Sequence, residues 1–117
     1  MVNSFKDLLV WQKSMELVEK VYHLTRVFPK HEIYGLVSQM RRSAVSIPSN
    51  ISEGFVRKSN NELRQFLHIS LGSLAELETQ LILSARLGYM QNSVLNEITS
   101  IIEHVGKMIT KLRQNMK

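Results

Sequence analysis

The chain contains no cysteine, and only 2 prolines and 5 glycines occur among its 117 residues. Without cysteine, disulfides, thiolate zinc sites and cysteine nucleophiles are excluded. The shortage of proline and glycine argues against an all-β fold, because such a fold needs a turn after every short strand. The 44% hydrophobic and 21% charged residues are typical of a globular protein. The length suits one domain over residues 1–117.

The sequence also lacks a long apolar run. No stretch approaches the ~20 apolar residues that a membrane span requires. Residues 1–7 contain no apolar core of a signal peptide. We therefore expect a cytoplasmic protein without a membrane partner.

Apolar residues recur at steps of three and four in four segments, which is the period of an amphipathic α-helix. The rows are Leu8, Trp11, Met15, Val18 and Tyr22, beside Val10, Leu17, Val21, Leu24 and Phe28, in the first segment; Ile33, Val37, Met40, Ala44, Ile47, Ile51 and Phe55 in the second; Leu63, Leu67, Ser70, Leu74, Leu77, Leu81 and Ala85 in the third; and Leu95, Ile98, Ile102, Val105, Ile109, Leu112 and Met116 in the fourth. Connections of about 3 to 5 residues make successive helices antiparallel. The predicted fold class is all-α, an up-down-up-down antiparallel four-helix bundle.

Several residues mark helix ends. Ser4, with Asp7 three residues later, is a predicted N-cap of the first helix. Ser59 begins a capping box with Glu62 at the start of the third helix. Gly88 suits the C-cap of that helix, because a C-cap often needs a positive φ.

Pro48 lies inside the second apolar row, where it either breaks the helix at Ile47 or kinks it. Because the apolar phase continues unbroken to Phe55, we favour one kinked helix. Gly72, in the middle of the third segment, predicts a close approach of another helix there.

The residues offer no pattern for a catalytic or metal site. No Glu-x-x-His pair of the kind that holds di-iron centres in helical bundles occurs. Each segment carries one of the four histidines, which are His23, His31, His68 and His104. An Arg–His spacing typical of some helical ribonucleases begins at Arg26, but Pro29 interrupts it. We expect no enzymatic activity, no metal, no cofactor and no small-molecule substrate.

Polar residues recur at helical spacing along one face of the second segment. They are Gln39, Ser43, Ser46, Asn50 and Glu53, with Arg57 next in the series. This face is either a partly exposed flank that tolerates serine, or a buried polar network or oligomer interface. In the second case Asn50 and Glu53 must find hydrogen-bond partners, because an unpartnered buried polar group costs ~1–3 kcal/mol.

Positive charge is in excess, with 15 lysines and arginines against 10 acidic residues and a formal charge of +5. In an antiparallel bundle, the start of the first helix, the second connection and the end of the fourth helix meet at one end. There we place seven cations against Asp7, Glu53 and Glu62; the cations are Lys6, Arg57, Lys58, Arg64, Lys111, Arg113 and Lys117. Lys13 and Lys20 continue along the first segment, and Arg41 and Arg42 form a pair on the second.

These cations have two interpretations. They complement the negative dipole ends of helices, or they bind the phosphates of nucleic acid without reading its bases. The candidate nucleic-acid-binding residues are Lys6, Lys13, Arg41, Arg42, Arg57, Lys58, Arg64, Lys111 and Arg113.

A set of ordered motifs covers most of the chain. It comprises residues 5–8 (FKDL), 11–13 (WQK), 21–22 (VY), 28–29 (FP), 32–36 (EIYGL), 39–44 (QMRRSA), 46–54 (SIPSNISEG), 66–67 (FL), 72–81 (GSLAELETQL) and 87–89 (LGY). With these motifs the sequence resembles the four-helix bundle family encoded in intervening sequences of bacterial 23S rRNA genes. It is also similar to the accessory variability determinant proteins of diversity-generating retroelements.

The resemblance implies a homopentamer and, by analogy with the accessory determinants, binding to nucleic acid. The hypothesis is a non-enzymatic homo-oligomer that binds RNA or DNA through a basic surface. The alternative is a protein–protein interaction scaffold whose cations serve only solubility and helix ends.

Overall fold

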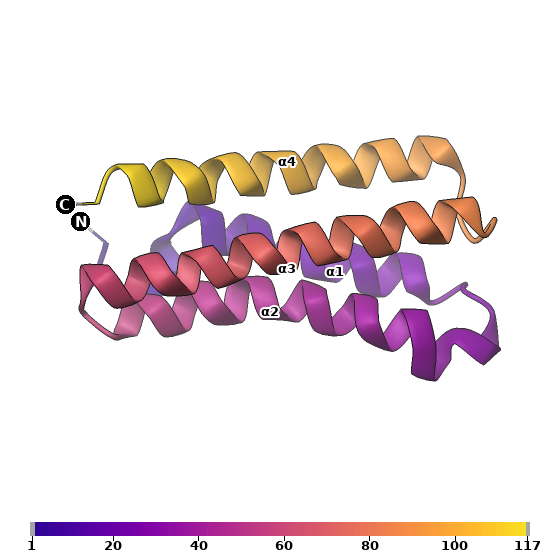
Figure 1. Ribbon diagram of the computed structural model, residues 1–117, viewed down its shortest axis with the longest axis horizontal. Helices are drawn as coiled ribbons and strands as arrows, with labels where there is room; N and C mark the ends of the chain where they lie inside the picture. Colours follow the sequence, from indigo (N-terminus) through magenta and orange to yellow (C-terminus); the bar gives the residue numbers. More distant parts are fainter. Residues whose placement is uncertain (1, 117) are drawn as a thin grey trace.

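The computed structural model describes residues 2–116 and is entirely helical over that range. Its four α-helices are α1 (Leu9–Thr25), α2 (Ser38–Val56), α3 (Asn60–Arg86) and α4 (Asn92–Gln114), and its short elements are the 3-10 turns η1 (Phe5–Asp7) and η2 (Lys30–Glu32) and the π-helical turn η3 (Ile33–Val37). The α-helices alternate in direction along a rod of 44 × 25 × 20 Å (Figure 1). The predicted all-α antiparallel bundle is therefore confirmed.

The core lies along the axis of the bundle and contains side chains from all four α-helices. Its fully buried members include Leu17, Val21, Met40, Ala44, Ile47, Ile51, Leu67, Leu77, Leu81, Val105 and Ile109. Most of the apolar residues predicted for the third and fourth segments face this core. The heptad pattern therefore predicts the inward faces of α3 and α4 correctly.

The two apolar rows of α1 are buried to different extents, and Leu8, Trp11 and Val18 of the first row are only half-buried against the core. Val10, Leu17 and Val21 are buried, whereas Met15 and Tyr22 of the other row are 38% and 39% exposed. The broad buried face that two adjacent apolar rows predict is therefore only partly formed, because the neighbouring helices cover only part of the circumference of α1. The partly covered row leaves exposed apolar surface at Met15 and Tyr22.

The predicted start of the second helix is also wrong. Residues 33–37 form the π-helical turn η3, in which Gly35 has φ −108° and ψ −110°, and Ile33 is 49% exposed and outside the core. The carboxylate of Glu32 accepts the Leu36 N–H at 3.2 Å and so caps this turn. From Ser38 onward, α2 runs through Pro48 to Val56 as one helix, so the break at Ile47 does not occur.

The helix ends follow the predicted caps in two places out of three. Ser59 Oγ accepts the Glu62 N–H at the start of α3, which is one of the two bonds of the predicted capping box, and Gly88 adopts φ +82° after the end of α3. The capping box of Ser4 and Asp7 exists, but it holds the 3-10 turn η1. The extended Leu8 (ψ 124°) then separates η1 from α1, so Ser4 is not the cap of the α-helix.

Gly54 of α2 lies in close contact with α3. A Cβ added there would lie 2.7 Å from Phe66 Cβ and 3.0 Å from Leu63 Cδ1 of α3. A Cβ on Gly72 would meet no atom within 4 Å, so the close packing predicted at Gly72 is wrong. Gly54 is therefore the glycine that brings α2 and α3 together.

Candidate functional site

The start of α1, the α2–α3 connection and the end of α4 lie at the same end of the rod (Figure 1). This arrangement brings together six of the predicted cations, which are Lys6, Arg57, Lys58, Arg64, Lys111 and Arg113. We call this set the terminal basic cluster. Lys117, predicted to join it, lies outside the described residues. Arg41 and Arg42 lie near the start of α2, at the opposite end.

Some of the predicted cations are already paired. Arg57 contacts Glu53 at 3.1 Å and Glu62 at 4.0 Å, and its guanidinium lies 5.3 Å from the Phe66 ring centroid. Lys13 pairs with Glu16 at 3.4 Å on the flank of α1. Cations neutralised in this way contribute little to the attraction of a polyanion.

Other members of the terminal basic cluster are not neutralised. Within residues 2–116, Lys6, Lys58 and Lys111 form no ion pair, and all three are exposed. Lys58 follows Arg57, the C-cap residue of α2, and has a left-handed backbone conformation with φ +58°. Arg64 donates to the side-chain oxygen of Asn61, at 3.0 Å. The Nε of Arg113 is buried without a hydrogen-bond partner among the described residues.

The polar face of α2 forms a hydrogen-bond network with α3. Ser46 Oγ lies 2.8 Å from Ser73 Oγ, and Asn50 Nδ2 donates to Ser46 Oγ at 2.9 Å. Ser70 Oγ, fully buried, donates to the Ile47 carbonyl oxygen at 3.0 Å. The small side chains let the two helices approach while their hydroxyl groups stay satisfied.

The remaining members of the predicted polar face are satisfied locally. Ser43 is buried and donates to the carbonyl oxygen of Gln39, whose own side chain is exposed. Glu53 pairs with Arg57. The network interpretation therefore holds within one chain for Ser46 and Asn50, whereas Ser43 is buried without joining the network.

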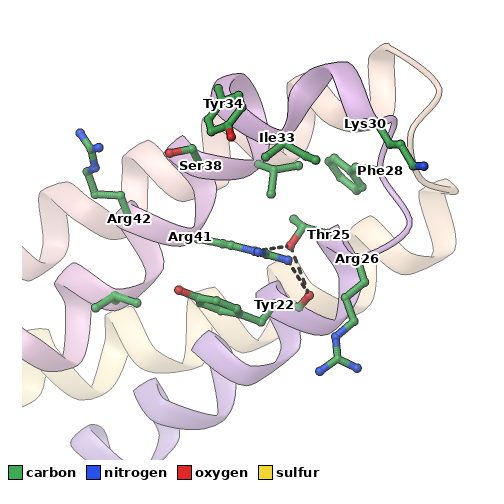
Figure 2. Close-up of a pocket in the computed structure, with 12 residues that line it drawn as sticks. Tyr22, Thr25, Arg26, Phe28, Lys30, Ile33, Tyr34, Ser38, Arg41 and Arg42 are labelled. Carbon is green, nitrogen blue, oxygen red and sulfur yellow. Dashed lines mark hydrogen bonds between the residues drawn. The ribbon is translucent and has the colours of Figure 1, made fainter.

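A second basic site surrounds a cavity of about 800 Å³ at the other end of the rod. Figure 2 shows that its walls come from the end of α1, the α1–α2 connection and the start of α2. Its four cationic residues are Arg26, Lys30, Arg41 and Arg42, and no carboxylate lines it. We call it the α1–α2 pocket.

Arg41 is fixed inside the α1–α2 pocket. Its Nε donates to Thr25 Oγ1 at 2.9 Å, its Nη2 donates to the Tyr22 carbonyl oxygen at 3.4 Å, and its guanidinium lies 4.5 Å from the Tyr22 ring centroid. Figure 2 shows the Arg41 side chain crossing the cavity next to the Tyr22 ring. The pocket therefore contains a positive charge of fixed position.

A hydrogen-bonded cluster ties the α1–α2 connection to the α3–α4 connection. Tyr89 donates its hydroxyl proton to Glu32 Oε2 at 2.8 Å, and its ring lies 5.4 Å from the ring of Phe28. This hydrogen bond, followed by that from the Leu36 N–H, lowers the pKa of the Glu32 carboxyl. The same bond raises the pKa of the Tyr89 hydroxyl. Both carboxylate oxygens of Glu32 therefore accept hydrogen bonds that stabilise the fold.

The α1–α2 pocket was not among the sites predicted from the sequence. The signal is the segment from residue 26 to residue 42, which contains four lysines and arginines but only one acidic residue, Glu32. Tyr34, 97% exposed at the rim of the pocket, was assigned no role. Periodicity could not reveal this site, because its residues come from a turn as well as from helices.

The described part of the chain contains no group of three or more His, Cys, Asp or Glu side chains placed to hold a metal ion. Within the same residues, no helix has the length and apolar character needed to cross a membrane.

Comparison with known proteins gives a fold match and a family. A crystal structure of a protein of unknown function from the S23 ribosomal protein family of Bacteroides thetaiotaomicron VPI-5482 is similar, with a TM-score of 0.84 and 23% identity. The match covers 92% of this chain and 96% of that one. No curated protein matches the sequence. Residues 6–111 match the family described as 23S rRNA-intervening sequence protein. The chain therefore belongs to the 23S rRNA-intervening sequence protein family.

Proposed function

We propose that the protein is a non-enzymatic, cytoplasmic homo-oligomer, a pentamer as in the similar accessory variability determinants, that binds the phosphate backbone of RNA or DNA. The observation that carries the proposal is the set of cations in the terminal basic cluster that form no ion pair within residues 2–116, above all Lys6, Lys58 and Lys111. Three exposed cations from three separate parts of the chain meet at one end of the rod.

Their chemistry suits phosphate groups. Lysine presents a flexible point charge, and several lysines that bind phosphates release condensed counterions from nucleic acid. The helix-dipole interpretation accounts for Lys111, in the last turn of α4. It does not account for Lys6, which lies near the N-terminal end of α1, where a cation opposes the dipole.

The partly covered apolar row of α1 supports assembly. Trp11, Met15 and Val18 line an apolar groove of about 300 Å³ together with Val45 and Pro48 of α2. A second copy seated on this groove would remove its exposed apolar surface from water. Five copies, each with a formal charge of +5, would carry +25, which would strengthen the attraction of a polyanion.

A salt titration of binding to a 12-base-pair duplex, followed by fluorescence anisotropy, tests the nucleic-acid proposal. Each lost phosphate contact lowers the slope of log K against log salt by about 0.9 for a duplex. We expect the triple variant Lys6→Ala, Lys58→Gly, Lys111→Ala to reduce the magnitude of this slope by about 2 to 3. Glycine replaces Lys58 because it adopts φ +58° without strain.

The matched control is Lys13→Ala, Lys20→Ala, Lys107→Ala, which removes the same charge from positions outside the terminal basic cluster. The control should keep most of the slope of the original protein. Equal losses in both triple variants, or no binding at low salt, would refute the proposal and favour the interaction scaffold.

Light scattering tests the assembly. We expect a mass of five chains for the original protein and a smaller mass for Met15→Lys, because Met15 is exposed on the apolar groove. A mass of one chain for the original protein would contradict the assembly proposal.

A further inference from the structure

The α1–α2 pocket presents an aromatic ring to solvent on a well-defined turn. Tyr34 is 97% exposed and lies on η3, which Glu32 caps from its N-terminal side. The exposed Ile33 precedes it on the same turn. Figure 2 shows the Tyr34 ring at one side of the cavity and the Tyr22 ring at the other. An exposed ring on a fixed turn is a suitable platform for a flat, apolar group.

The charge around this ring has one sign. Arg26, Lys30 and Arg42 stand at the rim, and Figure 2 shows their side chains extending away from the cavity. None of the three forms an ion pair within residues 2–116. The oxygens of Glu32, which could neutralise them, are engaged by Tyr89 and the Leu36 N–H.

Arg41 adds donors of fixed position. Its Nε and Nη2 bind Thr25 and Tyr22, whereas its Nη1 donates no hydrogen bond among the described residues. Because α1 already holds the guanidinium in place, little further side-chain entropy is lost when a ligand binds to it. An anionic oxygen is the acceptor that this free edge of the guanidinium suits best.

We propose that the α1–α2 pocket binds unpaired nucleotides of single-stranded nucleic acid, with a base stacked on Tyr34 and a neighbouring phosphate held by Arg41 and the cations at the rim. The inference rests on the proposed nucleic-acid binding and specifies the type of strand. An aromatic platform beside a basic groove is the usual arrangement for single strands, because every base has a stacking face. A duplex keeps its bases stacked on one another and cannot offer one to Tyr34.

The test compares a 12-nucleotide single-stranded RNA with a 12-base-pair duplex by fluorescence anisotropy at fixed low salt. We expect Tyr34→Ala to weaken single-strand binding roughly fivefold or more, which is the contribution of one stacked base. Tyr34→Phe should bind as the original protein does, because it keeps the ring. Duplex binding should be unchanged in both variants. Tyr34 is almost fully exposed, so neither variant should impair folding.

A second comparison tests the cations. Arg42→Ala should lower the salt slope for the single strand by about 0.7 if it holds one phosphate. Oligoglutamate of equal charge should compete poorly, because it has no bases. If it competes as well as the RNA, the pocket responds to charge alone and the inference is overturned.

The outcomes separate this inference from the proposed function. If neither nucleic acid binds at low salt, both fail. If both bind but Tyr34→Ala affects them equally or not at all, the inference is overturned while the proposed function stands. If Tyr34→Ala instead lowers the mass measured by light scattering, the ring is a contact between copies, which also overturns the inference.

Discussion

Replacement of Gly54 by alanine tests the packing of α2 on α3. In a helix interior, alanine is favoured over glycine by about 1 kcal/mol, so local propensity alone predicts a more stable protein. The new Cβ, however, would lie 2.7 Å from Phe66 Cβ and 3.3 Å from Leu63 Cα. Carbon atoms at their optimal distance are about 3.5–4.0 Å apart. The helices would therefore have to separate by roughly 1 Å.

The magnitude follows from these opposing effects. Overpacking a well-filled core costs about 1–3 kcal/mol, and the upper value applies here because a Cβ and a Cα move only with the backbone of α3. After subtraction of the propensity gain, we expect Gly54→Ala to destabilise the fold by about 2 kcal/mol. For a domain of this size that corresponds to a fall in melting temperature of about 8 °C.

Gly72→Ala is the matched control, because a Cβ on Gly72 meets nothing within 4 Å. It should stabilise the fold by up to about 1 kcal/mol. Urea unfolding followed by circular dichroism, at equal protein concentration, measures both variants. A Gly54→Ala protein as stable as the Gly72→Ala protein would show that α2 and α3 are not in close contact.

Three further predictions concern single side chains. Gly88→Ala should destabilise the fold by about 1–2 kcal/mol in thermal unfolding, because φ is +82° there; an unchanged melting temperature would contradict this conformation. Gln80→Met should stabilise it by about 1 kcal/mol in urea unfolding, because Gln80 is 8% exposed and its Oε1 is buried without a partner among the described residues; destabilisation would mean that the amide is satisfied. Tyr89→Phe removes the main cause of the lowered pKa of Glu32. The lowered pKa contributes stability that is present above pH 4.5 and lost as the pH falls further. The difference in melting temperature between the Tyr89→Phe variant and the original protein should therefore narrow below pH 4.5. A difference in melting temperature that stays constant with pH would refute this linkage.

The helical pattern of the sequence predicts most of the fold. The apolar rows of α3 and α4 identify their inward faces, because each of these helices has a single row. In α1 two rows compete, and periodicity cannot tell which one the neighbouring helices cover. The turn at residues 33–37 escapes prediction for another reason. Its apolar spacing continues that of α2, whereas Gly35 and the capping carboxylate of Glu32 set a different backbone.

The candidate site was predicted less completely than the fold. Antiparallel topology correctly places Lys6, Lys58 and Lys111 at one end. It cannot show that Arg57 is held by Glu53 and Glu62, since pairing depends on side-chain positions. Nor can it show that Arg41 is fixed against α1.

The ion pairs determine where the excess charge of the protein acts. Lys13–Glu16 and Lys20–Glu97 neutralise part of the flanks, whereas cations without an ion pair among the described residues remain at both ends of a rod 44 Å long. A duplex of 12 base pairs is about 41 Å long at 3.4 Å per base pair, so one such duplex lying along the rod does not extend beyond it. At about 0.15 M salt, charges much more than ~8 Å apart are largely screened from each other. On the proposed function, the two basic surfaces would therefore attract a polyanion independently of each other, and the α1–α2 pocket differs from the terminal basic cluster in two features, the exposed ring of Tyr34 and the fixed guanidinium of Arg41.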